Sequence, residues 1–243
     1  MLHSIVREDV VAEKVPGDTF AILPFFDDAS GCEKFVQRVL LFAPGTSHSR
    51  LEAAADEVLF VLDGSATLVL DGAPARVQQG VGAFVSRGTP WHVEADSPLE
   101  LLSVLVRDPE PVPPGFHAVV DLEEEGRQSA TAARQFTLGL TAERGCASVT
   151  QFIGFVPPGR APDHFHRYDE VLMILDGTGV LHIDGSASPL RAGTCVHLPA
   201  TVVHSLENAG DTELRLLGVF RPSGSPAEAY YPDGTPATYP EEN

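Results

Sequence analysis

Short apolar runs, separated by turn residues, recur along the whole chain. In the second half, such runs fall at residues 149–156, 171–175, 179–183, 195–199 and 214–220. Asp-Gly pairs at 176–177 and 184–185 are typical of hairpin turns. Short strands in quick succession with few helical stretches indicate an all-β protein, either a sandwich or a barrel.

The same pattern occurs twice. DEVLFVLDGSATLVLDG at residues 56–72 and DEVLMILDGTGVLHIDG at residues 169–185 share ten of seventeen positions at an offset of 169 − 56 = 113. Two copies of one unit predict two similar domains. The Pro-rich stretch at residues 107–116 is the expected linker, so we expect an N-terminal barrel over residues 1–110 and a C-terminal barrel over residues 111–243.

Charge and composition narrow the classes of function. A formal net charge of −18 repels phosphate backbones and anionic membrane surfaces, so no nucleic-acid or membrane partner is expected. No apolar run approaches the roughly 20 residues of a membrane span, and no secretory signal is visible. The three cysteines are odd in number and widely separated, which suits a reducing compartment, and we expect a cytoplasmic protein.

The clearest candidate chemistry lies in the second copy. His164 and His166 are two residues apart, and on a strand both side chains would enter the same space. Glu170 has the same parity, and His204 comes from a later strand that could return beside them. Three imidazoles and one carboxylate suit one divalent transition metal, Fe, Mn, Co, Ni, Cu or Zn, with positions left open for water or substrate.

These residues carry a family resemblance. GRAPDHFHRYDEVLMILDG at residues 159–177 resembles the first signature of the cupin superfamily, and GTCVHLPATVVHSLEN at residues 193–208 resembles the second. The resemblance implies a double-stranded β-helix, or jelly roll, with His164, His166, Glu170 and His204 as metal ligands. Two small departures, one missing residue before His164 and Thr201 where a second glycine is usual, touch no ligand.

The first copy departs much further. Counted back from Glu57, the places of His164 and His166 fall on Leu51 and Ala53, which cannot bind a metal. His92 aligns with His204 if one residue is dropped from the offset. A vestigial site of His48, Glu57 and His92 is therefore one interpretation, and a barrel kept only for packing and dimerisation is the other. The chain resembles a bicupin whose metal motif is intact only in the C-terminal barrel.

Four further residues lie close to the motif, and each could line a pocket: Tyr168, His182, Cys195 and His197. The Pro- and Tyr-rich stretch at residues 223–243 reads as an extended tail that packs over a barrel or a neighbouring subunit.

The resemblance implies a metalloenzyme that acts on a small organic molecule. A dioxygenase-type oxidoreductase is the first hypothesis, because three histidines and one glutamate recur in cupin dioxygenases. A Mn-dependent decarboxylase, an isomerase and a ureidoglycine aminohydrolase-like enzyme are alternatives, and so is a non-catalytic cupin that binds a small molecule. A monomer and a homodimer both fit the sequence.

Overall fold

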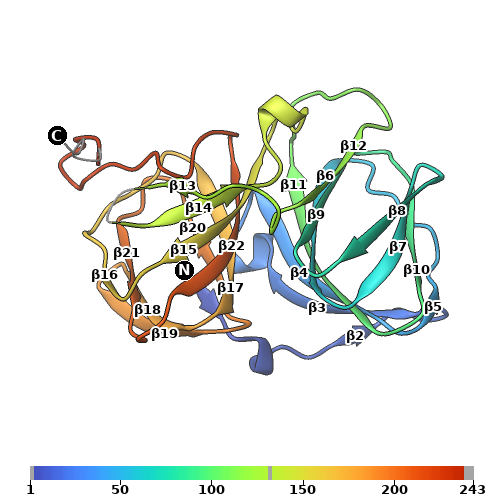
Figure 1. The fold of residues 1–243 in the computed structure, drawn as a ribbon, viewed down its shortest axis with the longest axis horizontal. Helices are drawn as coiled ribbons and strands as arrows, with labels where there is room; N and C mark the ends of the chain where they lie inside the picture. The colour runs from blue at the N-terminus through green and yellow to red at the C-terminus, as the bar shows by residue number, and fades with distance from the viewer. Residues whose placement is uncertain (1–2, 131–132, 238–243) are drawn as a thin grey trace.

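The computed structural model describes residues 3–130 and 133–237. Within these ranges the chain forms 22 strands, three short 3-10 turns and no α-helix, so the all-β prediction is confirmed. The strands build two barrels that lie side by side (Figure 1). The 3-10 turns all lie in connections: η1 (Arg7–Asp9), η2 (Asp28–Ser30) and η3 (Ala142–Arg144).

The N-terminal barrel packs a seven-stranded sheet against a four-stranded sheet. The large sheet has the order β12 (His117–Asp121), β9 (Val81–Val85), β6 (Ala55–Asp63), β11 (Leu99–Arg107), β4 (Phe35–Phe42), β3 (Phe20–Phe26), β2 (Glu13–Lys14). The small sheet has the order β5 (Gly45–Thr46), β10 (Trp91–Ala95), β7 (Ser65–Leu70), β8 (Ala73–Gln78).

The C-terminal barrel repeats this arrangement strand for strand, which confirms two jelly-roll barrels. Its large sheet has the order β1 (Ser4–Ile5), β20 (Cys195–Leu198), β17 (Asp169–Asp176), β22 (Leu214–Arg221), β15 (Thr150–Val156), β14 (Gln135–Leu138), β13 (Gln128–Ser129). Its small sheet has the order β16 (Gly159–Arg160), β21 (His204–Asn208), β18 (Thr178–Ile183), β19 (Ser186–Arg191).

Equivalent Asp-Gly hairpins close the small sheet of each barrel. Asp71 and Gly72 connect β7 to β8 with φ of 48° and 80°, and Asp184 and Gly185 connect β18 to β19 with φ of 49° and 71°. Two consecutive positive φ values define the type I′ turn, whose twist matches that of the flanking strands. The repeated sequence thus fixes the same register in both barrels.

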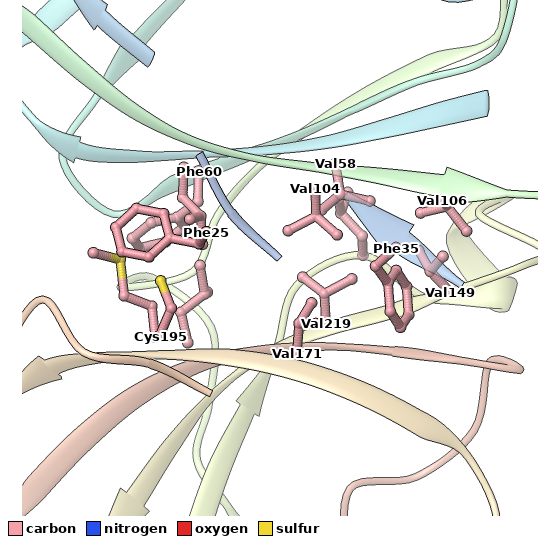
Figure 2. Close-up of a cluster of buried hydrophobic side chains, with 14 of the residues drawn as sticks. Phe25, Phe35, Val58, Phe60, Val104, Val106, Val149, Val171, Cys195 and Val219 are labelled. Carbon is pink, nitrogen blue, oxygen red and sulfur yellow. The ribbon is translucent and has the colours of Figure 1, made fainter. Parts of the chain in front are cut away.

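The two large sheets pack face to face through one shared apolar core (Figure 2). Gln37 in β4 donates to the carbonyl of Leu172 in the other barrel, and Gln151 in β15 donates to the carbonyl of Leu59, so the contact is nearly symmetric. The core between the sheets includes Phe25, Phe35, Val58, Phe60, Val104 and Val106 from one barrel, and Val171, Cys195 and Val219 from the other.

Each barrel also receives an edge strand from the segment that leads into the other. β1 pairs with β20 of the C-terminal barrel, and β12 pairs with β9 of the N-terminal barrel. The division after residue 110 stays a prediction, and these two edge strands cross it. Within the described residues, no helix is long and apolar enough to cross a membrane.

Candidate metal centre

Three histidine side chains converge at one end of the C-terminal barrel. His164 and His166 lie in the segment before β17, and His204 begins β21. His164 and His204 form an isolated antiparallel bridge, with His164 N donating to His204 O at 3.0 Å and His204 N donating to His164 O at 2.8 Å. One ring nitrogen of each of the three histidines lies within 4.8 Å of the corresponding atoms of the others.

Each imidazole is oriented by a backbone carbonyl. Nδ1 lies 2.8 Å from the Pro162 oxygen in His164, 2.8 Å from the Glu228 oxygen in His166 and 2.9 Å from the Val202 oxygen in His204. A carbonyl oxygen only accepts, so each Nδ1 carries the proton and each Nε2 keeps a free lone pair. This is the tautomer that metal-bound histidines adopt when the second ring nitrogen is hydrogen-bonded.

Burial keeps these rings neutral. Desolvation is the largest cause that lowers the pKa of His164 to about 4 and that of His166 to about 3, and it also takes the pKa of His204 well below its usual value. The other imidazoles add to the lowering for His166 and His204. All three rings therefore offer lone pairs at neutral pH.

Glu170 lies in β17 and lines the same cavity as the three histidines. Its carboxylate is not one of the ligand atoms that lie within 4.8 Å of one another. Burial raises its pKa to about 8, and Arg134 opposes this rise. A buried carboxyl with a pKa that high is a site where a cation would restore the charged form.

The cavity around these groups is small and mostly apolar, with a volume of about 80 Å³. The ring of Tyr168 stacks on that of His166 at 4.6 Å between centroids and on that of Phe220 at 4.0 Å. Desolvation raises the pKa of the Tyr168 hydroxyl well above its usual value, so the group stays a hydrogen-bond donor. Apolar side chains fill most of the remaining wall: Phe136, Phe152, Val156, Leu172, Leu198, Leu206 and Leu216.

The C-terminal tail covers this end of the barrel. Pro226 and Ala229 line the cavity, and the Glu228 carbonyl is the acceptor for His166. Tyr230 exchanges two backbone hydrogen bonds with Phe165, and the two rings stack at 5.6 Å. Residues 223–237 of the predicted tail thus pack over a barrel of their own chain and contribute directly to the histidine cluster, whereas residues 238–243 lie outside the described residues.

The donor set fits a divalent transition metal. Three neutral imidazoles with free Nε2 atoms and one carboxyl on the same cavity are ligands that Mn, Fe, Co, Ni, Cu and Zn share. The orienting carbonyls supply the outer hydrogen bonds that such ligands need.

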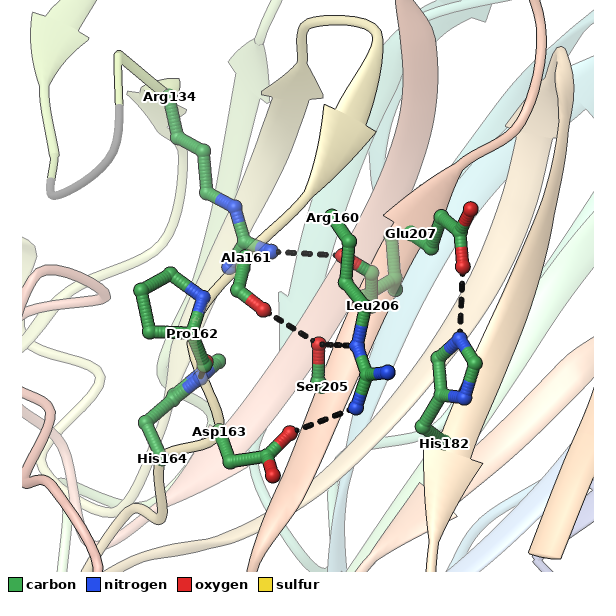
Figure 3. Close-up of polar contacts among 10 residues, drawn as sticks. All are labelled: Arg134, Arg160, Ala161, Pro162, Asp163, His164, His182, Ser205, Leu206 and Glu207. Atoms are coloured by element: carbon green, nitrogen blue, oxygen red, sulfur yellow. Dashed lines mark hydrogen bonds and ion pairs between the residues drawn. The ribbon is translucent and has the colours of Figure 1, made fainter.

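Of the four residues predicted to line a pocket, Tyr168 lies on the cavity wall and the other three do not. In β20, Val196 and Leu198 point into the barrel, so the side chains of Cys195 and His197 point to the other face. Cys195 therefore lies in the core between the barrels. His197 forms a hydrogen bond with Asp169 at 2.8 Å. In β18 the inward side chains are Leu181 and Ile183. His182 points outward and contacts Glu207 at 2.8 Å, on the side of the strands away from His164 (Figure 3).

In the N-terminal barrel, the structure does not bring His48, Glu57 and His92 together. The His48 side chain is 72 % exposed, and His92 lies 3.5 Å from Glu94 at the surface. Glu57 is buried and accepts hydrogen bonds from Trp91, Ser103 and Arg38. Within the described residues, a three-residue metal cluster occurs only in the C-terminal barrel.

Strand register shows which residues replace the histidines. Arg50 and Trp91 form the isolated bridge that corresponds to His164 and His204. Trp91 pairs with Leu70 as His204 pairs with Ile183, so the offset of 113 continues unbroken to Trp91. The alignment of His92 with His204 is therefore wrong.

His166 also has a counterpart that the sequence alignment missed. Gly88 N donates a hydrogen bond to Glu52 O at 2.7 Å. Thr201 lies at the same offset from Gly88, 201 − 88 = 113, and its N donates to His166 O, also at 2.7 Å. Glu52 thus takes the place of His166. Arg50 takes that of His164, so Leu51 and Ala53, expected from counting back, do not occupy those places.

Two contributors to the centre carried no sequence signal. Arg134 precedes β14, 30 residues before His164, and lines the cavity. The Glu228 carbonyl contacts a histidine 62 residues earlier. Both contacts depend on how distant segments close over the barrel.

Comparison with known proteins agrees with the repeat. The model of the Cupin domain family matches residues 38–105 and 152–220. Among solved structures, the putative glyoxylate-induced protein of Pseudomonas aeruginosa superposes with a TM-score of 0.75 at 20 % identity, over 89 % of this chain and 87 % of that one. An oxalate decarboxylase of Bacillus subtilis superposes with a TM-score of 0.74 at 14 % identity, over 92 % of this chain and 78 % of that one.

Curated relatives match shorter stretches. The polyketide synthase CurC of Streptomyces cyaneus is 29 % identical over 101 residues, which is 41 % of this chain and 66 % of that protein. The oxalate-binding protein of Thermotoga maritima is 38 % identical over 66 residues, which is 26 % of this chain and 54 % of that protein. The chain therefore spans less than two thirds of the length of these relatives.

Proposed function

The chain belongs to the cupin family, and we propose that its C-terminal barrel is the catalytic centre of a metal-dependent enzyme that acts on a small organic molecule. The convergence of three Nε2 lone pairs in a cavity of about 80 Å³ carries this proposal. His164, His166 and His204 would hold the ion, with Glu170 as the fourth ligand. The bound ion would supply a Lewis-acidic centre that coordinates an oxygen atom of the substrate.

The chain's own residues supply the rest of the site. The mostly apolar wall lowers the local dielectric constant, which strengthens polar interactions inside the cavity. Tyr168 offers the cavity a hydroxyl that stays protonated at neutral pH, and it can donate a hydrogen bond to a bound oxygen atom. The tail keeps His166 in its productive tautomer.

A dioxygenase-type oxidoreductase is the first candidate reaction, because a centre of three histidines and one carboxyl leaves positions for both substrate and oxygen. Decarboxylation is the second candidate. It is favoured by the small cavity, which suits a short acid, and by two relatives whose names refer to oxalate. Manganese and iron are the metals to test first.

Metal content tests the centre itself. We expect about one Mn or Fe per chain after purification without chelator or after reconstitution, as measured by elemental analysis. His166→Ala should reduce this content close to zero because it removes one imidazole ligand. His48→Ala, which changes an exposed histidine of the other barrel, is the matched control and should leave it unchanged.

The reaction class is tested on the loaded protein. Short organic acids, β-diketones and catechols are supplied to the Fe and Mn forms while oxygen uptake and carbon dioxide release are followed in parallel. Oxygen uptake coupled to substrate loss supports the oxygenase, and carbon dioxide release without net oxygen uptake supports the decarboxylase. Wild-type protein that holds no metal even after reconstitution would overturn the proposal.

A further inference from the structure

Arg134 brings a positive charge into the cavity that holds the three histidines. Its side chain extends from the segment before β14 toward the small sheet, where Nη2 donates to the Leu206 carbonyl at 3.0 Å (Figure 3). The residue as a whole keeps part of its surface exposed, but its guanidinium group is desolvated, which lowers its pKa to about 10. The group therefore remains charged at neutral pH.

This guanidinium has no close anionic partner within the described residues. Glu170 is the carboxyl that acts on it electrostatically, yet the two do not form an ion pair within 4.0 Å. A guanidinium offers five N–H donors, and the described residues accept one hydrogen bond from it. The cavity therefore contains a guanidinium whose remaining donors can accept an anionic ligand as partner.

The charge balance of the loaded site points the same way. A divalent ion, an ionised Glu170, three neutral imidazoles and Arg134 sum to +2 − 1 + 0 + 1 = +2. Such a site favours an anionic occupant, because opposite charges interact more strongly beside a mostly apolar wall than in bulk water.

The size of the cavity limits that occupant. Its volume of about 80 Å³ is several times the roughly 10–15 Å³ that a single water molecule needs. A short acid with a second oxygen function suits a space of this size.

We infer that Arg134 binds the carboxylate of a short organic acid, while a second oxygen of the same molecule reaches the three-histidine centre. This inference rests on the proposed function for the role of the metal, but the carboxylate contact itself does not require the metal. In the N-terminal barrel, β3 pairs with β4 in the same register as β14 pairs with β15. By this register, the residue that corresponds to Arg134 is Phe20. The carboxylate subsite is thus confined to the barrel that has the histidines.

The alternative is that Arg134 only braces β21 through the Leu206 carbonyl. Direct binding distinguishes the two roles. Malonate and glycolate, with malonamide and glycolamide as neutral counterparts of the same shape, are titrated calorimetrically into the Mn-loaded and the metal-free protein. We expect each carboxylate to bind wild-type protein at least tenfold more tightly than its amide.

Variants then assign the effect to one side chain. Arg134→Gln should weaken malonate binding about 10- to 100-fold and change malonamide binding less than about twofold. Arg134→Lys should lie between the two, because it keeps the charge and loses the planar fork. Arg160→Gln is the matched control, since Arg160 lies outside the cavity, paired with Asp163 at 2.9 Å, and it should leave malonate binding unchanged.

Several results would overturn the inference. Equal affinity of wild-type protein for the acid and its amide refutes it without any variant, including the case in which Arg134→Gln fails to fold. Unchanged malonate binding by a folded Arg134→Gln with full metal content assigns Arg134 to bracing alone. Loss of metal from the wild type contradicts the proposed function instead, and the metal-free titration still decides whether Arg134 binds the carboxylate.

Discussion

Glu57 in the N-terminal barrel accepts hydrogen bonds from Ser103, Trp91 and Arg38, whereas its counterpart Glu170 accepts none within the described residues. The two carboxyls occupy the same register position, because Glu57 pairs with Val85 as Glu170 pairs with Leu198. One barrel satisfies its buried carboxyl with protein groups. The other leaves it facing a cavity.

The substitutions around the carboxyl explain this difference. Ser103 corresponds to Gly218, and Arg38 corresponds to Phe152, as the pairing of β4 with β11 and of β15 with β22 shows. A Cβ at Gly218 would lie 2.3 Å from the Phe152 ring and 2.9 Å from the Glu170 carboxylate. Glycine is therefore required there for Phe152 and Glu170 to lie together, and the cavity depends on it.

Arg50 fills the corresponding space in the N-terminal barrel. Its guanidinium carbon lies 3.9 Å from the Phe20 ring centroid and 4.5 Å from that of Trp91. Desolvation lowers its pKa to about 10, so it remains a cation where the other barrel would hold a metal. The same fold thus surrounds its central carboxyl with guanidinium groups in one barrel and with a cavity that holds three histidines in the other.

The largest expected effect is on stability. Glu57→Gln should lower the free energy of unfolding by about 3 kcal/mol. Arg38 would lose its buried charged partner, and Trp91 and Ser103 would donate to a neutral amide in place of a carboxylate. Glu170→Gln should change it by less than about 1 kcal/mol in metal-free protein, because the carboxyl it replaces is protonated at pH 7. Urea unfolding of both metal-free variants measures the difference, and equal losses would contradict the comparison.

The tail provides the next test. Within residues 3–130 and 133–237, the segment after β11 does not cover the N-terminal barrel in the same way, since it continues into β12 of the same sheet. Truncation after Gly224 removes the Glu228 carbonyl from His166 and should weaken metal binding about 10- to 100-fold.

The control for this truncation ends the chain after Ala237 and keeps the contacts of Glu228 with His166 and of Tyr230 with Phe165. Competition with a chelator compares the metal affinities of the two shortened chains. Equal affinities would mean that the Pro162 and Val202 carbonyls alone suffice to orient the cluster.

The fold and the histidine cluster could be predicted because their signals are local. The repeat at residues 56–72 and 169–185 encodes one strand-hairpin-strand unit twice, and His164 and His166 are two residues apart. The place of His204 in the first copy cannot be read from the sequence alone, because a histidine lies beside Trp91. Only the pairing of Trp91 with Leu70 shows that the offset continues.

Long-range contacts and strand direction could not be predicted in this way. Arg134 reaches its acceptor across 72 residues, and the tail reaches His166 across 62. Cys195 and His197 have the parity opposite to Val196 and Leu198, and only the packing of the two large sheets decides which pair faces the cavity. Both faces of β20 are buried, so the pattern of apolar residues does not show in the sequence which face lines the cavity.

The smallest effect concerns protons. Glu170, with a pKa of about 8, is mostly protonated at pH 7 in metal-free protein, whereas the three histidines are already neutral. Metal binding should therefore release about one proton at pH 7 and almost none at pH 9, and the affinity for Mn²⁺ should rise about tenfold between these values. Calorimetry in buffers of different ionisation enthalpy measures the release.

Glu170→Gln should abolish this proton release, and Glu57→Gln should leave it unchanged, because the N-terminal carboxyl is committed to protein donors. A release that persists in Glu170→Gln would assign the proton to another group. The central carboxyl of the C-terminal barrel would then not be the one that responds to the metal.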